Sequence, residues 1–133
     1  MDMEISFPGS KKVNAKYKGF IIKTDQPIQE GGDGSATEPF SLFLSSIGTC
    51  TGLYVLRFCQ ERNISTNDLK MILRTVKNEK TKMIEKIYME VKAPKTFPDN
   101  YKKAVIKAAG LCTVKKHLER PPKIEISITK DSN

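Results

Sequence analysis

The sequence predicts a single domain of the α+β class, residues 1–133, in which antiparallel sheets surround one long central helix. A long apolar segment with helical spacing lies between two groups of short segments that alternate apolar and polar residues. The strands come in groups before and after the helix, and do not alternate with helices as in a parallel α/β fold. A chain of 133 residues can bury a core without disulfides or metals.

The beginning of the chain predicts a meander of three short antiparallel strands. Met3 to Phe7 and Lys12 to Tyr17 alternate well enough for strands, with Pro8-Gly9-Ser10 as the turn between them, and Phe20 to Lys23 follows after Lys18-Gly19. The polar, Gly-rich segment from Asp25 to Ala36 predicts a loop. Its Gly31-Gly32-Asp33-Gly34 run lacks the glycine order of a phosphate-binding loop. A plain connector and a mobile flap over a site remain as alternatives.

The long central helix is predicted to begin at Pro39 and to continue to Gln60, with Arg57 as its only charged residue. Apolar residues recur at intervals of three, four and seven, and further apolar residues fill the flanks. We therefore expect a helix that is buried on almost all sides. Its length also suits a membrane span. However, the small and hydroxylated centre, SSIGTCTG, favours a buried helix of a protein without a membrane-spanning segment.

The second half of the chain predicts a hairpin, two helices and a last strand. The hairpin strands run from Asp68 to Lys77 and from Met83 to Lys92, with one wet face. Helical spacing follows from Asp99 to Ala109 and from Leu111 to Glu119, with Gly110 as the stop between them. The segment from Lys123 to Thr129, KIEISIT, alternates and predicts a strand.

The three cysteines are an odd number and include no C-x-x-C pair. This argues against a disulfide framework or a zinc site and for a reducing compartment, and the acidic beginning MDMEISFPG does not resemble a secretory signal. We therefore expect a cytoplasmic protein. The net charge of +8 raises nucleic acid as a partner, but the lysines are dispersed and accompany no nucleic-acid-binding motif. Solvated lysines, with no nucleic-acid partner, are the prediction.

Each cysteine has a different predicted setting. Small residues flank Cys50, so a substrate or another backbone can approach it, although a free cysteine is most often a small buried hydrophobic residue. Cys112 lies where a helix begins, and unpaired N–H groups there lower the pKa of a thiol. Cys50 lies well inside its helix, so a thiolate there needs a neighbouring cation from elsewhere in the fold. Cys59 is predicted to face the core, away from Cys50.

The segment TEPFSLFLSSIGTCTG, followed further along by AAGLCTVKKHL, resembles the OsmC/Ohr family of thiol-dependent peroxidases. The shared features are a proline that opens the long helix, an L-x-x-x-x-G-x-C run and a second cysteine in a C-x-V context. Here these are Pro39, the run that ends at Cys50, and Cys112 with Val114. The order of elements also agrees along essentially the whole chain.

The resemblance implies an OsmC-like fold, an intertwined homodimer, and no metal or organic cofactor. Cys50 would be oxidised to a sulfenic acid by an organic hydroperoxide, and Cys112 would resolve it as a Cys50–Cys112 disulfide. A dithiol reductant would restore both thiols. The only histidine, His117, suits a capping cation or a solvated face.

Two positions place the sequence in a divergent branch of this family. Phe40 stands where better-known members have a glutamate, and no arginine precedes Arg57, so Lys16 or Lys18 are the candidate cations for a Cys50 thiolate. The alternative function is a non-catalytic dimer of the same fold that binds a small apolar ligand or is purely structural. Thiol reactivity separates the two.

Overall fold

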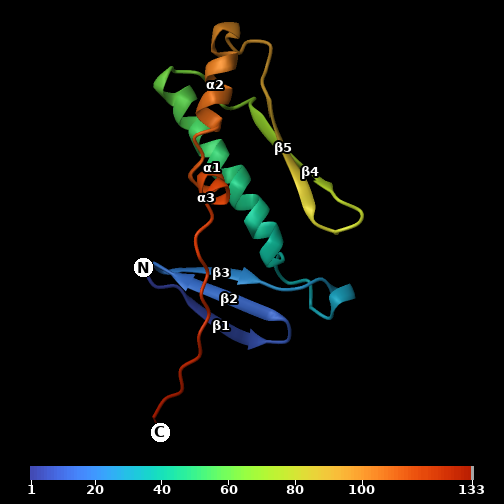
Figure 1. Ribbon diagram of the computed structural model, residues 1–133. Coiled ribbons are helices and arrows are strands. Elements are labelled where there is room, and N and C mark those ends of the chain that lie inside the picture. Colours follow the sequence, from blue (N-terminus) through green and yellow to red (C-terminus); the bar gives the residue numbers. More distant parts are fainter. Residues whose placement is uncertain (133) are drawn as a thin grey trace. The chain divides into compact units, whose positions relative to one another are not determined.

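The computed structural model describes residues 1–132, and its elements confirm the α+β class (Figure 1). The chain divides into two compact units, Met1–Ser46 and the remainder from Ile47 onward, and each is described here by itself. The first contains a three-stranded sheet, and the second contains most of the long helix, a hairpin and two shorter helices. That residues 1–133 form a single domain stays a prediction.

The first unit begins with the predicted meander. Strands β1 (Glu4–Gly9), β2 (Lys12–Tyr17) and β3 (Phe20–Thr24) pair antiparallel in that order. The turn between β2 and β3 has positive φ at both central residues, Lys18 (49°) and Gly19 (80°). A two-residue turn with this backbone matches the right-handed twist of the strands that it joins. This two-residue turn therefore fixes the register in which β2 and β3 pair.

The loop after β3 folds around the carboxylate of Asp25. This side chain is fully buried, and it accepts hydrogen bonds from the Ser35 hydroxyl (2.6 Å), the Ser35 N–H (3.0 Å) and the Gln26 N–H (2.7 Å). The bonds from Ser35, with smaller contributions from neighbouring N–H groups, lower the pKa of Asp25 to about 2. A short 3₁₀ turn, η1 (Ile28–Glu30), lies inside the loop. The buried carboxylate gives the loop a defined internal structure, as a connector requires.

The long helix α1 (Pro39–Glu61) begins at the predicted proline and has the predicted length. Its buried residues form one stripe that recurs every three or four positions: Ile47, Thr51, Val55, Phe58 and Cys59. The prediction of burial on almost all sides is wrong for the single chain, in which Leu53 is 41% exposed. One chain supplies elements to cover only one face of the helix. By length and composition alone, α1 would also pass as a membrane span.

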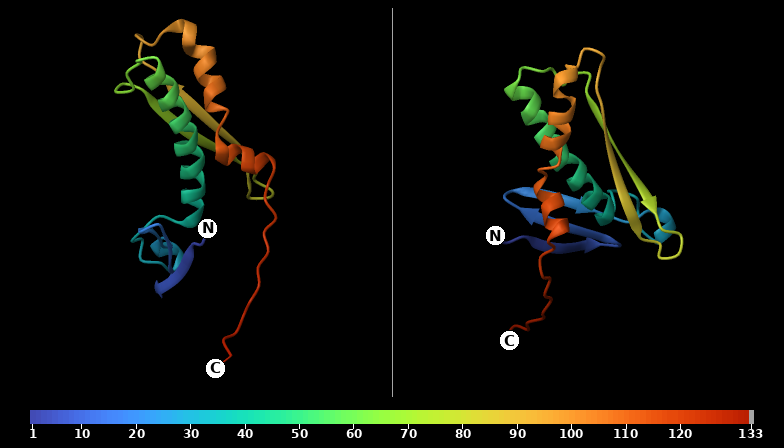
Figure 2. Two further views of the ribbon diagram at one scale, coloured as in Figure 1. Left: turned by 90° about the vertical axis from the view of Figure 1, so that its left-hand side faces the viewer. Right: turned by 45° about the horizontal axis from the view of Figure 1, so that its top comes forward.

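The second unit packs the remaining elements on α1. Strands β4 (Lys70–Lys77) and β5 (Ile84–Lys92) form the predicted antiparallel hairpin. After η2 (Asp99–Tyr101), helix α2 (Lys102–Ala109) runs beside the second half of α1, and α3 (Thr113–Glu119) follows (Figure 2). The buried core comprises Val55, Phe58, Cys59, Phe97 and Val105. This core holds α2 against α1.

The predicted last strand, Lys123 to Thr129, does not form. The segment has no strand or helix, and its apolar side chains are almost fully exposed: Ile124 82%, Ile126 94% and Ile128 86%. An alternating segment becomes a strand only when a neighbouring strand accepts its backbone hydrogen bonds. Within the described part of this chain, no strand pairs with it.

Replacing Gly32 by alanine should destabilise the Asp25 loop. A Cβ atom at this position would lie 1.9 Å from the carbonyl oxygen of Gln26, so the backbone beside Asp25 would have to move. We expect Gly32→Ala to lower the free energy of unfolding by about 1–3 kcal/mol in urea titrations. The matched control is Gly110→Ala, whose nearest contact would be 3.4 Å from the Lys107 carbonyl oxygen. Equal losses in the two variants would contradict the prediction.

Candidate functional site

The structure brings Cys50 and Cys112 together and keeps Cys59 in the core. Cys50 is half-buried on α1, whereas Cys112 and Cys59 are both fully buried. The Cys50 side chain lies near enough to Cys112 to contribute to lowering the pKa of its thiol. Cys59 packs with Val55 and Phe58 in the core, as predicted. All three thiols are free, so the structure corresponds to the reduced protein.

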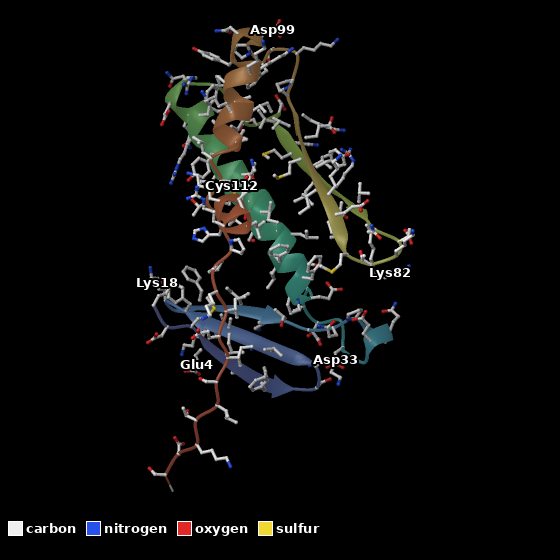
Figure 3. The ribbon with its side chains drawn as sticks, in the orientation of Figure 1. Glu4, Lys18, Asp33, Lys82, Asp99 and Cys112 are labelled. Atoms are coloured by element: carbon white, nitrogen blue, oxygen red, sulfur yellow. The ribbon has the colours of Figure 1, made fainter. Side chains whose placement is uncertain are left out.

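Two features position Cys112 beside α1. Helix α2 is capped by Gly110, whose N–H bonds to the Ile106 carbonyl oxygen (3.2 Å), while the Leu111 N–H bonds to that of Ala108 (3.0 Å), and the chain then turns into α3. Cys112 is the N-cap of α3, which confirms its predicted place at a helix start. The next residue, Thr113, has its hydroxyl 3.1 Å from the Tyr54 hydroxyl of α1. Figure 3 shows the labelled Cys112 close to α1.

Hydrogen bonds favour the thiolate form of Cys112. Burial by itself raises the pKa of this thiol, since it penalises the charged form. The Lys115 N–H, with its nitrogen 3.4 Å from the sulfur, opposes this effect, as do the Thr51 hydroxyl, the Cys50 thiol and the Val114 N–H. Together these donors hold the pKa of Cys112 below its usual value. The position of Cys112 at a helix start, which the sequence indicated, is therefore one of several causes that lower its pKa.

The small residues around Cys50 admit a close neighbour, as the sequence indicated. A Cβ atom at Gly48 would lie 3.7 Å from Leu73 Cδ1, and one at Gly52 would lie 3.7 Å from Met71 Sδ. Both neighbours belong to β4, so the glycines allow the hairpin to pack closely on α1. The candidate cations Lys16 and Lys18 belong to the other compact unit. Their role at Cys50 stays a prediction.

A shallow apolar pocket of about 300 Å³ adjoins the elements that carry the two sulfurs. Its walls include Ile47, one helical turn before Cys50, together with Ile87 and Met89 of β5 and Leu118 of α3. Lys115 contributes a positive charge to the rim, and its N–H also donates to the Cys112 sulfur. Glu85 and Lys86 of β5 also line the pocket, so it combines apolar walls with charges of both signs.

Cys59 and His117 take no part in the thiol pair. Burial raises the pKa of Cys59, and the nearby Arg62 only partly offsets this. His117 is exposed, and its Nδ1 lies 2.7 Å from the Thr113 carbonyl oxygen of the first turn of α3; its predicted role as a capping cation or part of a solvated face stays a prediction. Over residues 1–132, no three His, Cys, Asp or Glu side chains gather as a metal site would require.

Thr51 belongs to the site, although the sequence interpretation treated it only as a small residue beside Cys50. Its side chain is buried, its hydroxyl makes no hydrogen bond of ordinary geometry among the described residues, and it helps to lower the pKa of Cys112. The position of Thr51 on the helix could have revealed that it is buried. Thr51 follows Ile47 by four residues and precedes Val55 by four, so it is a polar residue within an apolar stripe.

Comparisons with known proteins identify the family. A family model described as OsmC-like protein matches residues 32–127, so the chain belongs to the OsmC-like family. No similar sequence was found among curated proteins.

Solved structures support the same fold. A Psychrobacter arcticus 273-4 protein, provisionally described as an osmotic stress induced and detoxification response protein, has a TM-score of 0.71 at 18% identity. The comparison covers 86% of this chain and 85% of that one. A hypothetical protein from Aquifex aeolicus VF5 has a TM-score of 0.63 at 22% identity, with coverages of 90% and 87%. A Legionella pneumophila organic hydroperoxide resistance protein OsmC has a TM-score of 0.54 at 17% identity, with coverages of 89% and 89%.

The settings of the three thiols predict different alkylation rates in the folded protein. We expect iodoacetamide to modify Cys50 fastest, because its sulfur is the most accessible. Cys112 should follow slowly, and Cys59 should react last, since burial raises its pKa. Peptide mass spectrometry over time measures the order, and unfolding in urea should equalise the rates. Modification of Cys59 as fast as that of Cys50 would contradict the assigned burial.

Proposed function

We propose that the protein is a thiol-dependent peroxidase that reduces organic hydroperoxides. The proximity of Cys50 to Cys112, whose pKa it helps to lower, is the observation that carries this proposal. A half-buried thiol beside a fully buried one, whose thiolate is favoured, suits the roles of attacking and resolving cysteine. Membership of the OsmC-like family supports the assignment, as does a structural neighbour described as an organic hydroperoxide resistance protein.

The proposed reaction uses two thiols and one hydroperoxide. The Cys50 sulfur, as thiolate, attacks the terminal oxygen of ROOH; the S–O bond forms, the O–O bond breaks, and ROH leaves after protonation. The Cys112 thiolate then attacks the Cys50 sulfenic acid, and hydroxide leaves as the disulfide forms. An external dithiol reduces the disulfide by thiol–disulfide exchange and is itself oxidised. The two cysteines thereby return to the reduced state.

The apolar pocket beside the thiols suits the organic group of the hydroperoxide. Isoleucine, methionine and leucine side chains provide an adaptable apolar wall, and Lys115 supplies a charge at its rim. A hydroperoxide with an apolar group would bury that group here while its peroxide oxygen approaches Cys50. The same pocket favours the second candidate, a binding protein for a small apolar ligand that makes no use of the sulfurs.

A homodimer is the second part of the proposal. The exposed apolar side chains of the single chain include Phe7 and Ile21 of the sheet, Leu53 of α1, and Ile124 and Ile126 of the C-terminal segment. Exposed apolar surface of this extent is typical of a protein–protein interface. A second copy would bury such side chains on both subunits, as the symmetry of a homodimer requires.

One equivalent of cumene hydroperoxide should convert Cys50 and Cys112 to an intramolecular disulfide and leave Cys59 reduced. The reason is that Cys50 lies near Cys112, whereas Cys59 is in the core. Peptide mapping without reduction measures the pairing. Cys112→Ser should stop at a sulfenic acid on Cys50, which dimedone traps, and should overoxidise with excess peroxide. Cys50→Ser should abolish peroxide consumption.

Cys59→Ser is the matched control, because it changes a cysteine that faces the core. We expect it to lower stability and to leave the rate of peroxide consumption nearly unchanged. Free thiols at both Cys50 and Cys112 after peroxide treatment would exclude the peroxidase and favour the ligand-binding protein. A disulfide that includes Cys59 would contradict the site described here.

Sedimentation equilibrium at micromolar concentration should show a species with twice the 15.0 kDa mass of the chain. The exposed isoleucines of the C-terminal segment supply part of the expected interface, so Ile126→Lys should weaken the association. A lysine change at an exposed polar site, Ser127→Lys, is the matched control. A monodisperse 15.0 kDa species would rule out the dimer.

A further inference from the structure

Helix α3 needs an anchor outside itself. It has seven residues, none of which is buried, and so short a helix is unstable unless other parts of the protein hold it. The ion pair between Lys115 and Glu119 (3.6 Å) lies within this helix and does not reach α1. Cys112 is the N-cap of α3, so the direction of its side chain depends on the first turn of the helix. A contact that holds this turn therefore also controls where the Cys112 sulfur lies.

The Tyr54 hydroxyl of α1 supplies such an anchor. It lies 3.1 Å from the hydroxyl of Thr113, which is the first residue of α3 and directly follows Cys112. On α1, Tyr54 follows Cys50 by four residues, so the two side chains lie on the same face of the helix. The contact therefore joins the residue next to Cys112 with a residue one helical turn from Cys50.

A second anchor precedes Cys112 in the chain. Helix α2 is held on α1 by the core, which contains Val105 of α2 and Val55 of α1, and Gly110 then caps α2. The core thus sets where the chain leaves α2, whereas the hydroxyl contact sets where it enters α3. Cys112 lies between these two points, so its position relative to Cys50 depends on both of them.

We propose that Tyr54 is a positioning residue for the second step of the peroxidase reaction and acts on Cys112 through Thr113. This inference rests on the proposed function. The contact between the two hydroxyls keeps Cys112 within reach of the Cys50 sulfenic acid. Holding two reacting groups near each other speeds their reaction, so the disulfide forms before a second hydroperoxide can oxidise Cys50 further.

The Cys50 sulfenic acid has two competing fates. In the first, the Cys112 thiolate attacks the Cys50 sulfur; the S–S bond forms, the S–O bond breaks, and the hydroxide that leaves takes a proton from solvent. The Cys112 sulfur is thereby oxidised and the Cys50 sulfur reduced. In the second, another molecule of ROOH oxidises the sulfenic acid to a sulfinic acid and is itself reduced to ROH. Tyr54 and Thr113 keep their protons in both reactions, and their contact speeds the first.

The test compares the two products after reduced protein is mixed with excess cumene hydroperoxide and quenched at successive times. Mass spectrometry gives the ratio of Cys50–Cys112 disulfide to Cys50 sulfinic acid, and the loss of the Cys50 thiol gives the rate of the first step. Tyr54→Phe keeps the ring and removes the hydroxyl. It should lower the ratio by about two- to ten-fold, the effect of one hydrogen bond, and leave the first rate unchanged.

Thr113 provides the matching variants. Thr113→Val removes the second hydroxyl with little change of shape and should lower the ratio as Tyr54→Phe does, whereas Thr113→Ser keeps the hydroxyl and should retain the ratio of the parent. Because Tyr54→Phe and Thr113→Val break the same contact, the double variant should have the same ratio as either single one. Both residues lie outside the buried core, so these variants should fold. Tyr88→Phe, the same chemical change on β5, is the control and should match the parent.

An unchanged ratio in Tyr54→Phe would refute the positioning role and leave the peroxidase proposal unaffected. A slower loss of the Cys50 thiol in this variant would also refute the role, since Tyr54 would then act on the first step. If hydroperoxide forms no disulfide in any variant, the peroxidase proposal fails, and the equilibrium of the two cysteines with oxidised and reduced glutathione decides the role of Tyr54. A Cys50–Cys112 disulfide that is less stable by about two- to ten-fold in Tyr54→Phe supports the role, and one of equal stability refutes it.

Discussion

The packing of α2 against the second half of α1 is the constraint on which the candidate site depends. Val55 and Phe58 of α1 meet Phe97 and Val105, and the chain turns at Gly110 only after this contact has set the position of α2. Cys112 therefore lies near Cys50 because the apolar core positions α2. The contact between the Tyr54 and Thr113 hydroxyls also holds this segment against α1. Since protein interiors transmit small displacements, substitutions in this core should also alter the geometry of the two sulfurs.

Features that depend on neighbouring residues along the chain could be predicted from the sequence. The proline-initiated α1, the β4–β5 hairpin and the helix start at Cys112 each have a local signal in periodicity or in turn residues. The family resemblance then predicted that Cys50 and Cys112 act as a pair. The structure places the two cysteines near each other, as an intramolecular disulfide between them would require.

Features that depend on a partner outside the local sequence could not be predicted. The segment KIEISIT has a strand pattern, but a pattern does not supply the neighbouring strand, and the segment remains unpaired within the described chain. The apolar flanks of α1 indicated burial without indicating what would cover them. Thr51 was overlooked because its role depends on Cys112, which is distant in sequence and meets α1 only through tertiary packing.

The way in which the Cys112 sulfur is held has a consequence for the response of the protein to salt. N–H and hydroxyl donors act on it at contact distance inside the protein, where dissolved ions do not screen them. The field of the +8 chain, in contrast, acts through solvent and fades over about 8–10 Å at ordinary ionic strength. Ionic strength should thus govern how anionic molecules approach the surface, whereas the buried Cys112 sulfur keeps its surroundings in dilute and concentrated media.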